Sequence, residues 1–157
     1  MVITRVTAVG WIAVAVMLLT SGCGGSSEPT GPSELSATGR WVGTAPEGMI
    51  VELNPMGNCS SEFDLELNLT SSSTGGVTGT ATTRLRKTTP GASCSDVLGQ
   101  VNTYGLFNGK VGLATISFDL GSTSAYRFSG TFTATRMTGT FVITEFPESG
   151  RFAVNRQ

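Results

Sequence analysis

Apolar and polar residues alternate along residues 62–70. Positions 63, 65, 67 and 69 hold Phe or Leu, and the positions between them hold Asp, Glu or Asn. Successive side chains of an extended chain point to opposite faces, so this alternation predicts a strand with one buried and one hydrated face. A second alternating segment, residues 77–86, follows the Ser- and Gly-rich residues 71–76, and the two together predict a β-hairpin.

Turn-forming residues recur about every ten positions between Gly39 and Gln157, with Thr and aromatic residues between them. This spacing is typical of an all-β barrel or sandwich. We therefore expect an all-β domain over residues 39–157, a small antiparallel up-and-down β-barrel of about eight strands, with a β-sandwich as the alternative. The remaining strands are expected at residues 40–44, 49–54, 97–107, 111–120, 124–133, 137–144 and 150–156.

Three segments, residues 77–80, 128–131 and 137–140, share the pattern apolar–Ser/Thr–Gly–Thr. A glycine inside a strand indicates a bend or a close approach of two backbones, which a small barrel needs. An eight-stranded barrel is filled by side chains or holds one small ligand; a filled core is the default here and a lipophilic pocket the alternative. The side chains expected to converge inside are Phe63, Leu65, Leu67, Ile116, Phe118, Tyr126, Phe128, Phe132, Phe141, Ile143 and Phe152.

The N-terminal segment has a different character. Arg5 precedes an apolar run over residues 6–19, which only Thr7 and Gly10 interrupt, and small residues follow it. This order is that of a secretory signal peptide, and the run is shorter than the roughly 20 residues that a membrane-spanning helix needs. Residues 1–22 are therefore expected to be a signal peptide.

The end of this segment, Leu18-Leu19-Thr20-Ser21-Gly22-Cys23, resembles the lipobox of bacterial lipoproteins. The resemblance implies that Cys23 is lipidated, becomes the mature N-terminus and carries acyl chains such as palmitate, which anchor a protein stably when two or more are present. It implies a lipid-anchored protein of the bacterial cell envelope, and Gly24 favours the outer membrane, on its periplasmic or surface face. Residues 23–38 are rich in Gly, Ser and Pro and are expected to form the lipidated Cys and a flexible tether.

Two further cysteines lie in the β-rich part of the chain. Cys59 precedes the best-defined strand and Cys94 follows the hairpin partner of that strand. Because exported proteins meet an oxidising compartment, we expect a Cys59–Cys94 disulfide that staples the two loops. Closing a loop of this length is worth roughly 4 kcal/mol in the chain-entropy model.

A tryptophan near the start of the domain and arginines near its end suggest how one end of the barrel closes. Gly39-Arg40-Trp41 is a G-x-W, and the last expected strand carries Arg151 and Arg156. This combination resembles the calycin group of up-and-down barrels, the lipocalins and avidins, in which a late arginine covers the tryptophan. The resemblance implies barrel closure by Gly39, Trp41 and either Arg151 or Arg156, because an indole face attracts a guanidinium.

The composition limits the chemistry open to the chain. It contains no His, which excludes every catalytic or metal-binding arrangement that uses a His of this chain. A net charge of -1 does not fit nucleic-acid binding, which needs a basic surface. Glu62, Asp64 and Glu66 share one strand face; ion pairing, with Arg84 or Arg86 opposite Glu62, is the simpler interpretation, and a calcium or magnesium site is the alternative.

These patterns predict a lipid-anchored envelope lipoprotein that is not an enzyme. The first hypothesis is a non-catalytic binding module that holds a small apolar ligand in its barrel. The alternative is an envelope protein-interaction or inhibitor protein with a closed core. The expected partners are the membrane, through the lipid anchor, and either a small apolar ligand or an envelope protein; no catalytic residue, metal ligand or cofactor is expected.

Overall fold

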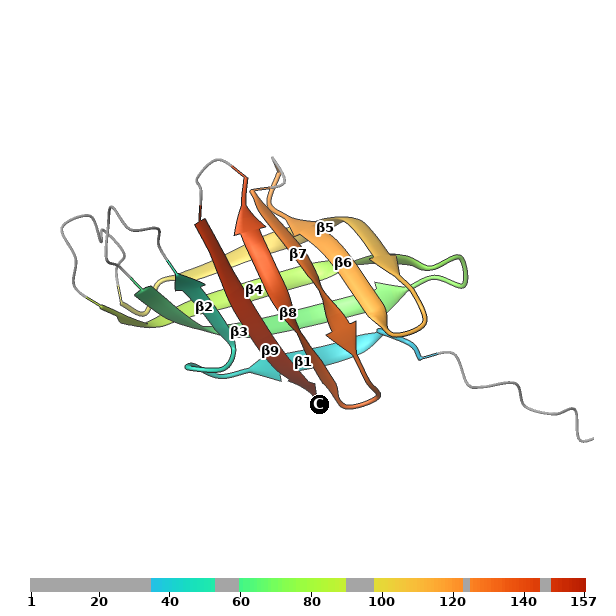
Figure 1. Ribbon diagram of the computed structural model, residues 1–157, viewed down its shortest axis with the longest axis horizontal. Coiled ribbons are helices and arrows are strands. Elements are labelled where there is room, and N and C mark those ends of the chain that lie inside the picture. Colours follow the sequence, from blue (N-terminus) through green and yellow to red (C-terminus); the bar gives the residue numbers. More distant parts are fainter. Residues whose placement is uncertain (1–34, 53–59, 90–97, 123–124, 145–147) are drawn as a thin grey trace, which may run out of the picture. The chain divides into compact units, whose positions relative to one another are not determined.

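A computed structural model describes residues 35–52, 60–89, 98–122, 125–144 and 148–157, which belong to one compact unit, Ser33–Gln157. The expected signal peptide, Cys23, Cys59 and Cys94 lie outside the described residues. No helix in the described part is long and apolar enough to cross a membrane. The strands are β1 (Gly39–Gly43), β2 (Met49–Glu52), β3 (Ser60–Ser71), β4 (Gly76–Thr88), β5 (Val101–Val111), β6 (Thr115–Leu120), β7 (Tyr126–Phe132), β8 (Arg136–Ile143) and β9 (Glu148–Arg156) (Figure 1).

The strands form one closed antiparallel sheet. From β3 to β9 each strand pairs with the next in the sequence, and β1 and β2 both lie between β3 and β9. In Figure 1, β7, β8 and β9 pass in front of β3 and β4, with the core between the two layers. A closed sheet leaves no row of unpaired backbone groups along an edge, which is the advantage of a barrel over an open sheet.

The first strand of the barrel is interrupted. Gly43 pairs with Leu65 and Met49 pairs with Phe63, so residues 44–48 bulge out opposite Asp64. The backbone N–H of Ala45 donates a hydrogen bond to a carboxylate oxygen of Asp64 at 3.0 Å, which ties this bulge to β3. Segments β1 and β2 therefore share one of eight strand positions. The expected all-β up-and-down barrel of about eight strands is confirmed, and the sandwich alternative is not.

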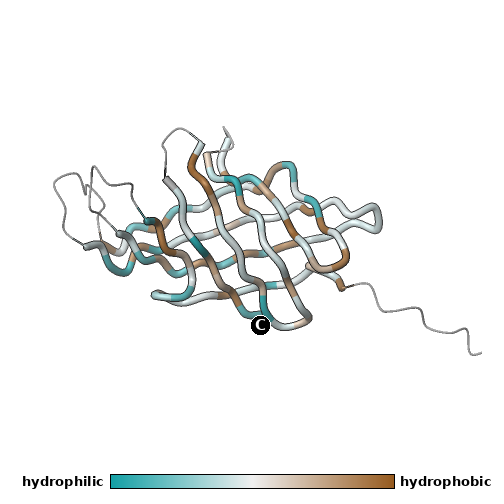
Figure 2. Tube along the Cα trace, viewed as in Figure 1, coloured by the Kyte–Doolittle hydropathy of each residue, from teal (hydrophilic) through white to brown (hydrophobic). Residues whose placement is uncertain are grey.

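The barrel interior is built from aromatic and branched side chains, and hydrophobic and hydrophilic positions alternate along several strands (Figure 2). Phe128 lies at its centre, stacked on Phe118 and Phe141 with ring centroids 5.0 and 4.9 Å apart, and Phe152 meets it edge-on at 5.1 Å. All eleven side chains that the sequence placed inside belong to this core or pack against it.

Two glycines explain how four phenylalanine rings fit in one small barrel. Gly139 and Gly150 lie in the inward phase of β8 and β9, and a methyl group at Gly150 would overlap the ring of Phe141. A methyl group at Gly139 would lie 2.7 Å from the ring of Phe152, closer than real contacts allow. The Gly of the third repeated pattern therefore makes room for a ring, in agreement with the close-approach interpretation.

The register of the β3–β4 hairpin corrects one prediction. From Phe63 to Ser71 the paired residue numbers sum to 148, one of the two values that the alternation allows. A bulge between Glu62 and Phe63 then shifts the pairing by one residue, so Glu62 faces Lys87 and neither Arg84 nor Arg86. A bulge inserts one extra residue, which an alternation pattern alone does not reveal.

Up-and-down topology gives the barrel two distinct ends. The connections β2–β3, β4–β5, β6–β7 and β8–β9 all join strands at one end, which we name the cavity end. Residue 35 and the C-terminal Gln157 lie at the opposite end, which we name the terminal end, with the connections β3–β4, β5–β6 and β7–β8.

Replacing the central ring tests this packing. Phe128→Ala should lower the free energy of unfolding by about 3–5 kcal/mol, because it removes a fully buried ring and leaves a cavity. The matched control Phe107→Ala removes a ring that is 47% exposed on the outer face and should cost at most about 1 kcal/mol. Urea unfolding of residues 33–157, followed by the fluorescence of Trp41, measures both. Equal losses would contradict the packing.

Candidate ligand-binding site

Trp41 and Arg156 close the terminal end. The guanidinium carbon of Arg156 lies 5.0 Å from the centre of the Trp41 ring, and Trp41 is fully buried. The indole N–H of Trp41 donates to the backbone carbonyl of Ala37 at 2.9 Å, and the ring packs edge-on against Phe132 at 6.4 Å. The indole of Trp41 can therefore be buried at this end of the barrel, because its N–H has a hydrogen-bond acceptor and its ring face contacts a guanidinium.

Arg156 also holds the backbone around it. Its guanidinium donates to the carbonyls of Ser36 at 3.0 Å and Ala134 at 3.3 Å, and to that of Thr38. Gly39 has a φ of +138°, and a side chain there would meet Arg156 at 3.2 Å, so the glycine allows the guanidinium to reach these carbonyls.

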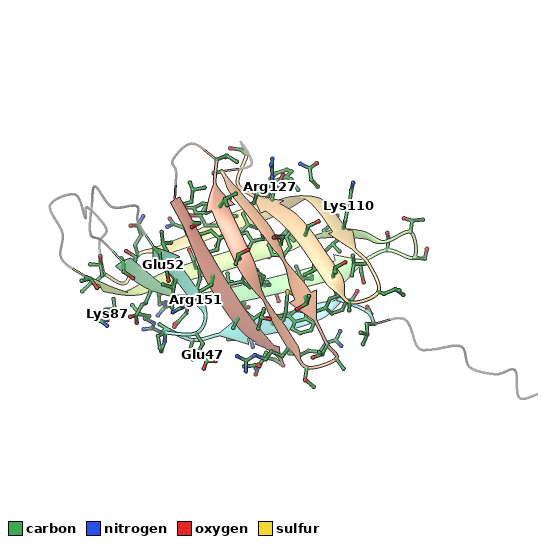
Figure 3. The ribbon with its side chains drawn as sticks, in the orientation of Figure 1. Glu47, Glu52, Lys87, Lys110, Arg127 and Arg151 are labelled. Carbon is green, nitrogen blue, oxygen red and sulfur yellow. The ribbon has the colours of Figure 1, made fainter. Side chains whose placement is uncertain are left out.

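The two arginines that the sequence left as alternatives have different surroundings. Arg151 faces outward and pairs with Glu52 at 3.7 Å, and Figure 3 shows these two side chains side by side on β9 and β2. Both side chains are about two-thirds exposed, at 67% and 60%. Of the two, Arg156 is therefore the one that lies over Trp41.

Residues 35–38, which the sequence assigned to the flexible tether, pack against the barrel. Ala37 is fully buried and the hydroxyl of Thr38 accepts a hydrogen bond from the backbone N–H of Ser71 at 2.9 Å. The Ser36 hydroxyl lies 3.1 Å from that of Ser71. The packed domain thus includes residues before Gly39. The G-x-W motif predicts where the first strand begins, but it does not reveal the segment that packs before this strand.

The cavity end is less completely filled. A cavity of about 100 Å³ opens there inside the barrel. Tyr104 and Tyr126 pack edge-on beside it with ring centroids 5.7 Å apart, and Tyr126 reaches Phe141 of the core at 6.2 Å. The described residues that line it are Met49, Val51, Phe63, Thr83, Leu85, Gln100, Asn102, Tyr104, Leu120 and Tyr126.

One wall of this cavity is apolar and the other is polar. The apolar side chains come from β2, β3, the end of β4 and the end of β6. The polar wall runs from β4 to β5: Thr83 pairs directly with Asn102, and the amide of Gln100 donates to the amide oxygen of Asn102 at 3.4 Å. Few convergent polar groups in an apolar pocket are what fixes the orientation of a small ligand.

The acidic face of β3 is occupied by ion pairs. Lys87 lies 3.1 Å from Glu62, Arg86 lies 2.6 Å from Asp64, and Arg40 makes two 2.9 Å hydrogen bonds to Glu66. The hydrogen bonds from Arg40, and then that from Asn68, hold the pKa of Glu66 below its ordinary value, and Glu66 raises the pKa of Arg40. The ion-pair interpretation of this face is confirmed.

Asp119 is a buried carboxylate outside the hydrophobic core. It lies on the outer face of β6, yet it is 6% exposed. Asn108 donates to its carboxylate at 2.9 Å and Arg127 lies 3.5 Å from it. Arg127 itself is 62% exposed, so this cluster joins β5, β6 and β7 at the surface.

The polar wall of the cavity is the part of the site that the sequence analysis did not identify. Thr83 follows Ala81 and precedes Leu85 in the inward phase of β4, and Asn102 and Tyr104 precede Leu106 in the inward phase of β5. A polar residue in the inward phase of a strand was the available signal. The predictions depended on charged clusters and on inward apolar residues, and inward polar residues belong to neither group.

Exchanging each arginine tests the closure. Arg156→Gln should lower the free energy of unfolding by about 1.5–3 kcal/mol, because it removes a cation–π contact and charged hydrogen bonds to carbonyls. Arg151→Gln breaks an exposed pair and should cost about 0.5 kcal/mol or less. Urea unfolding of residues 33–157 measures both. Similar losses, or a larger one for Arg151→Gln, would show that Arg156 does not close the barrel.

The barrel thus has Trp41 and Arg156 packed together at the terminal end and, at the cavity end, a small pocket with one polar wall. No protein family, characterised protein or solved structure gave a significant match to this chain. The function of this protein is therefore inferred from its own residues and their geometry.

Proposed function

We propose that this chain is a lipid-anchored lipoprotein of the bacterial envelope, a non-catalytic binding module that holds a small ligand at the cavity end of its barrel. The observation that carries the ligand part is the cavity of about 100 Å³ with an apolar wall and a polar wall. The anchor part rests on the signal-like segment and the lipobox resemblance at Cys23.

The topology suits such an anchor. The chain enters the barrel at the terminal end, where Arg156 binds the carbonyls of Ser36 and Thr38. The cavity lies at the other end, so residues 35–38 join the barrel at the end without the cavity. Residues 24–34 could extend by at most roughly 40 Å, which limits how far the barrel could stand from the membrane.

The disulfide remains part of this proposal. Thr89 donates its backbone N–H to the carbonyl of Ser60 at 2.8 Å, so the chain positions that lead to Cys59 and Cys94 start from neighbouring strands. A bridge between the two cysteines would link two loops at the cavity end. Such a bridge would restrain the cavity-end termini of β3 and β4.

A second candidate function, a protein-interaction or inhibitor protein, rests on the outer face. Phe107, Asp119, Arg127 and Val142 are consecutive cross-strand neighbours over β5 to β8. Phe107 and Val142 are each 47% exposed on either side of the Asp119–Arg127 pair. Apolar groups around a charged pair are common in protein interfaces.

Mass spectrometry of protein made in its own host tests the proposal. Expression of the full chain should give a product that begins at Cys23 and carries the covalent mass of acyl chains, and Cys23→Ser should lack this mass. Residues 33–157, exported with an unrelated signal peptide, should show under native conditions a non-covalent small-molecule adduct that disappears on denaturation. The denatured mass should be lower by two hydrogens for a Cys59–Cys94 bridge.

The lipid anchor and the ligand-binding function are tested separately by these masses. An unmodified Cys23 would remove the anchor. A bare native mass of residues 33–157 would contradict the ligand-binding function and favour the outer face as the functional surface.

A further inference from the structure

Thr83 places a polar group deep in the barrel. It is 4% exposed, and within the described part of the chain its hydroxyl has no hydrogen-bond partner. Among the described residues, every fully buried polar atom of a side chain has a hydrogen-bond partner. Because the Thr83 hydroxyl has none, it is not fully buried, and Thr83 lines the cavity. A hydroxyl held out of bulk water without a protein partner is available to a ligand.

Tyr104 adds a second hydroxyl of this kind. It lies two residues beyond Asn102 along β5, and no hydrogen bond of its hydroxyl occurs among the described residues. Its ring is held edge-on against Tyr126, which fixes its direction without using the hydroxyl. Thr83, Asn102 and Tyr104 therefore offer donors and acceptors on neighbouring strands.

The described lining of the cavity carries no charged side chain. The charged residues of β4 nearest in sequence, Arg84 and Arg86, lie in the outward phase and are exposed. A charged ligand would lose hydration on entering the cavity without meeting an opposite charge on these walls, which is costly. A wholly apolar ligand would cover the hydroxyl of Thr83 and leave it unpaired, which is also unfavourable.

The size of the cavity limits what can be buried. About 100 Å³ is below the roughly 300–1,000 Å³ of pockets that enclose drug-sized ligands. It approaches the roughly 150 Å³ in which an engineered protein cavity binds benzene. The cavity thus limits the buried group to at most about the size of a single ring, whether this is a whole ligand or the end of a longer one.

We infer that the cavity binds an uncharged amphipathic small molecule, with a ring-sized apolar group against Phe63 and Leu85 and a neutral hydroxyl or carbonyl group at Thr83 and Tyr104. This inference rests on the proposed function and specifies its ligand class. It replaces the purely apolar ligand that the sequence suggested, because the inward wall of β4 and β5 is polar.

Four small aromatic probes of similar size distinguish an amphipathic ligand from an apolar, an anionic and a cationic one. Benzyl alcohol is neutral and amphipathic, toluene lacks the polar group, benzoate is an anion and benzylammonium is a cation. Each is titrated into isotope-labelled residues 33–157 while the amide resonances of Thr83, Leu85 and Tyr104 are followed by NMR. Benzyl alcohol should bind at these residues in the millimolar range, as suits so few atoms, and the two ions at least about tenfold more weakly.

Variants identify the contact. Thr83→Val should weaken benzyl alcohol about three- to tenfold and leave toluene unchanged or tighter, because only the hydroxyl is lost. The matched control Thr80→Val alters an exposed, outward-facing threonine of the same strand and should change neither. Tyr104→Phe provides the same comparison at the second hydroxyl if Thr83→Val does not keep the folded spectrum.

The outcomes separate this inference from the proposed function. The proposed ligand class is wrong if toluene or either ion binds at the cavity as tightly as benzyl alcohol or more tightly. It is also wrong if neither Thr83→Val nor Tyr104→Phe changes the affinity for benzyl alcohol. A native adduct would still support a ligand-holding barrel in that case. If no probe moves the lining residues the ligand class is wrong, and a bare native mass would then remove the proposed function as well.

Discussion

Closure of the sheet is the constraint on which the other features of this protein depend. Segments β1 and β2 share one position and each pairs with β3 on one side and β9 on the other. The number of strands sets the width of a closed sheet, and eight strands leave an interior just wide enough for side chains or for one small ligand. The inward residues then decide, level by level, whether the barrel is filled or hollow.

The two ends of the barrel resolve this choice differently. Toward the terminal end, large rings fill the interior and Arg156 covers Trp41 while binding nearby carbonyls. At the cavity end, Thr83 and Asn102 occupy inward positions where larger apolar side chains would complete the core. Because polar side chains replace larger apolar ones at these positions, a small cavity remains, and one of its walls is polar. The ion pairs on the outer face contribute little stability by comparison, since their cations are exposed.

Much of this fold could be predicted from the sequence because period-two alternation reports directly which side chains face inward. All nine strands were expected within about four residues of their observed bounds, with β5 and the start of β6 displaced most. The alternation allowed two registers for residues 63–71, and one of them is observed. The bulge that moves Glu62 opposite Lys87 could not be predicted, since it depends on how the sheet bends. A lipophilic pocket was the alternative to a filled core, but the polar wall of the cavity was not expected. Inward polar residues of neighbouring strands form one surface only when the strands are aligned, and the register of β4 and β5 was not predicted.

The central claim is that the sheet closes through a first strand split into two segments. Solution NMR of residues 33–157 tests it most directly, through contacts between backbone protons of neighbouring strands. The account predicts contacts of Val42 with Asn155 and of Ile50 with Arg151, together with contacts of both segments with β3. If β9 shows contacts with β8 alone, the sheet is open, and neither the packing of Trp41 with Arg156 nor the cavity exists as described.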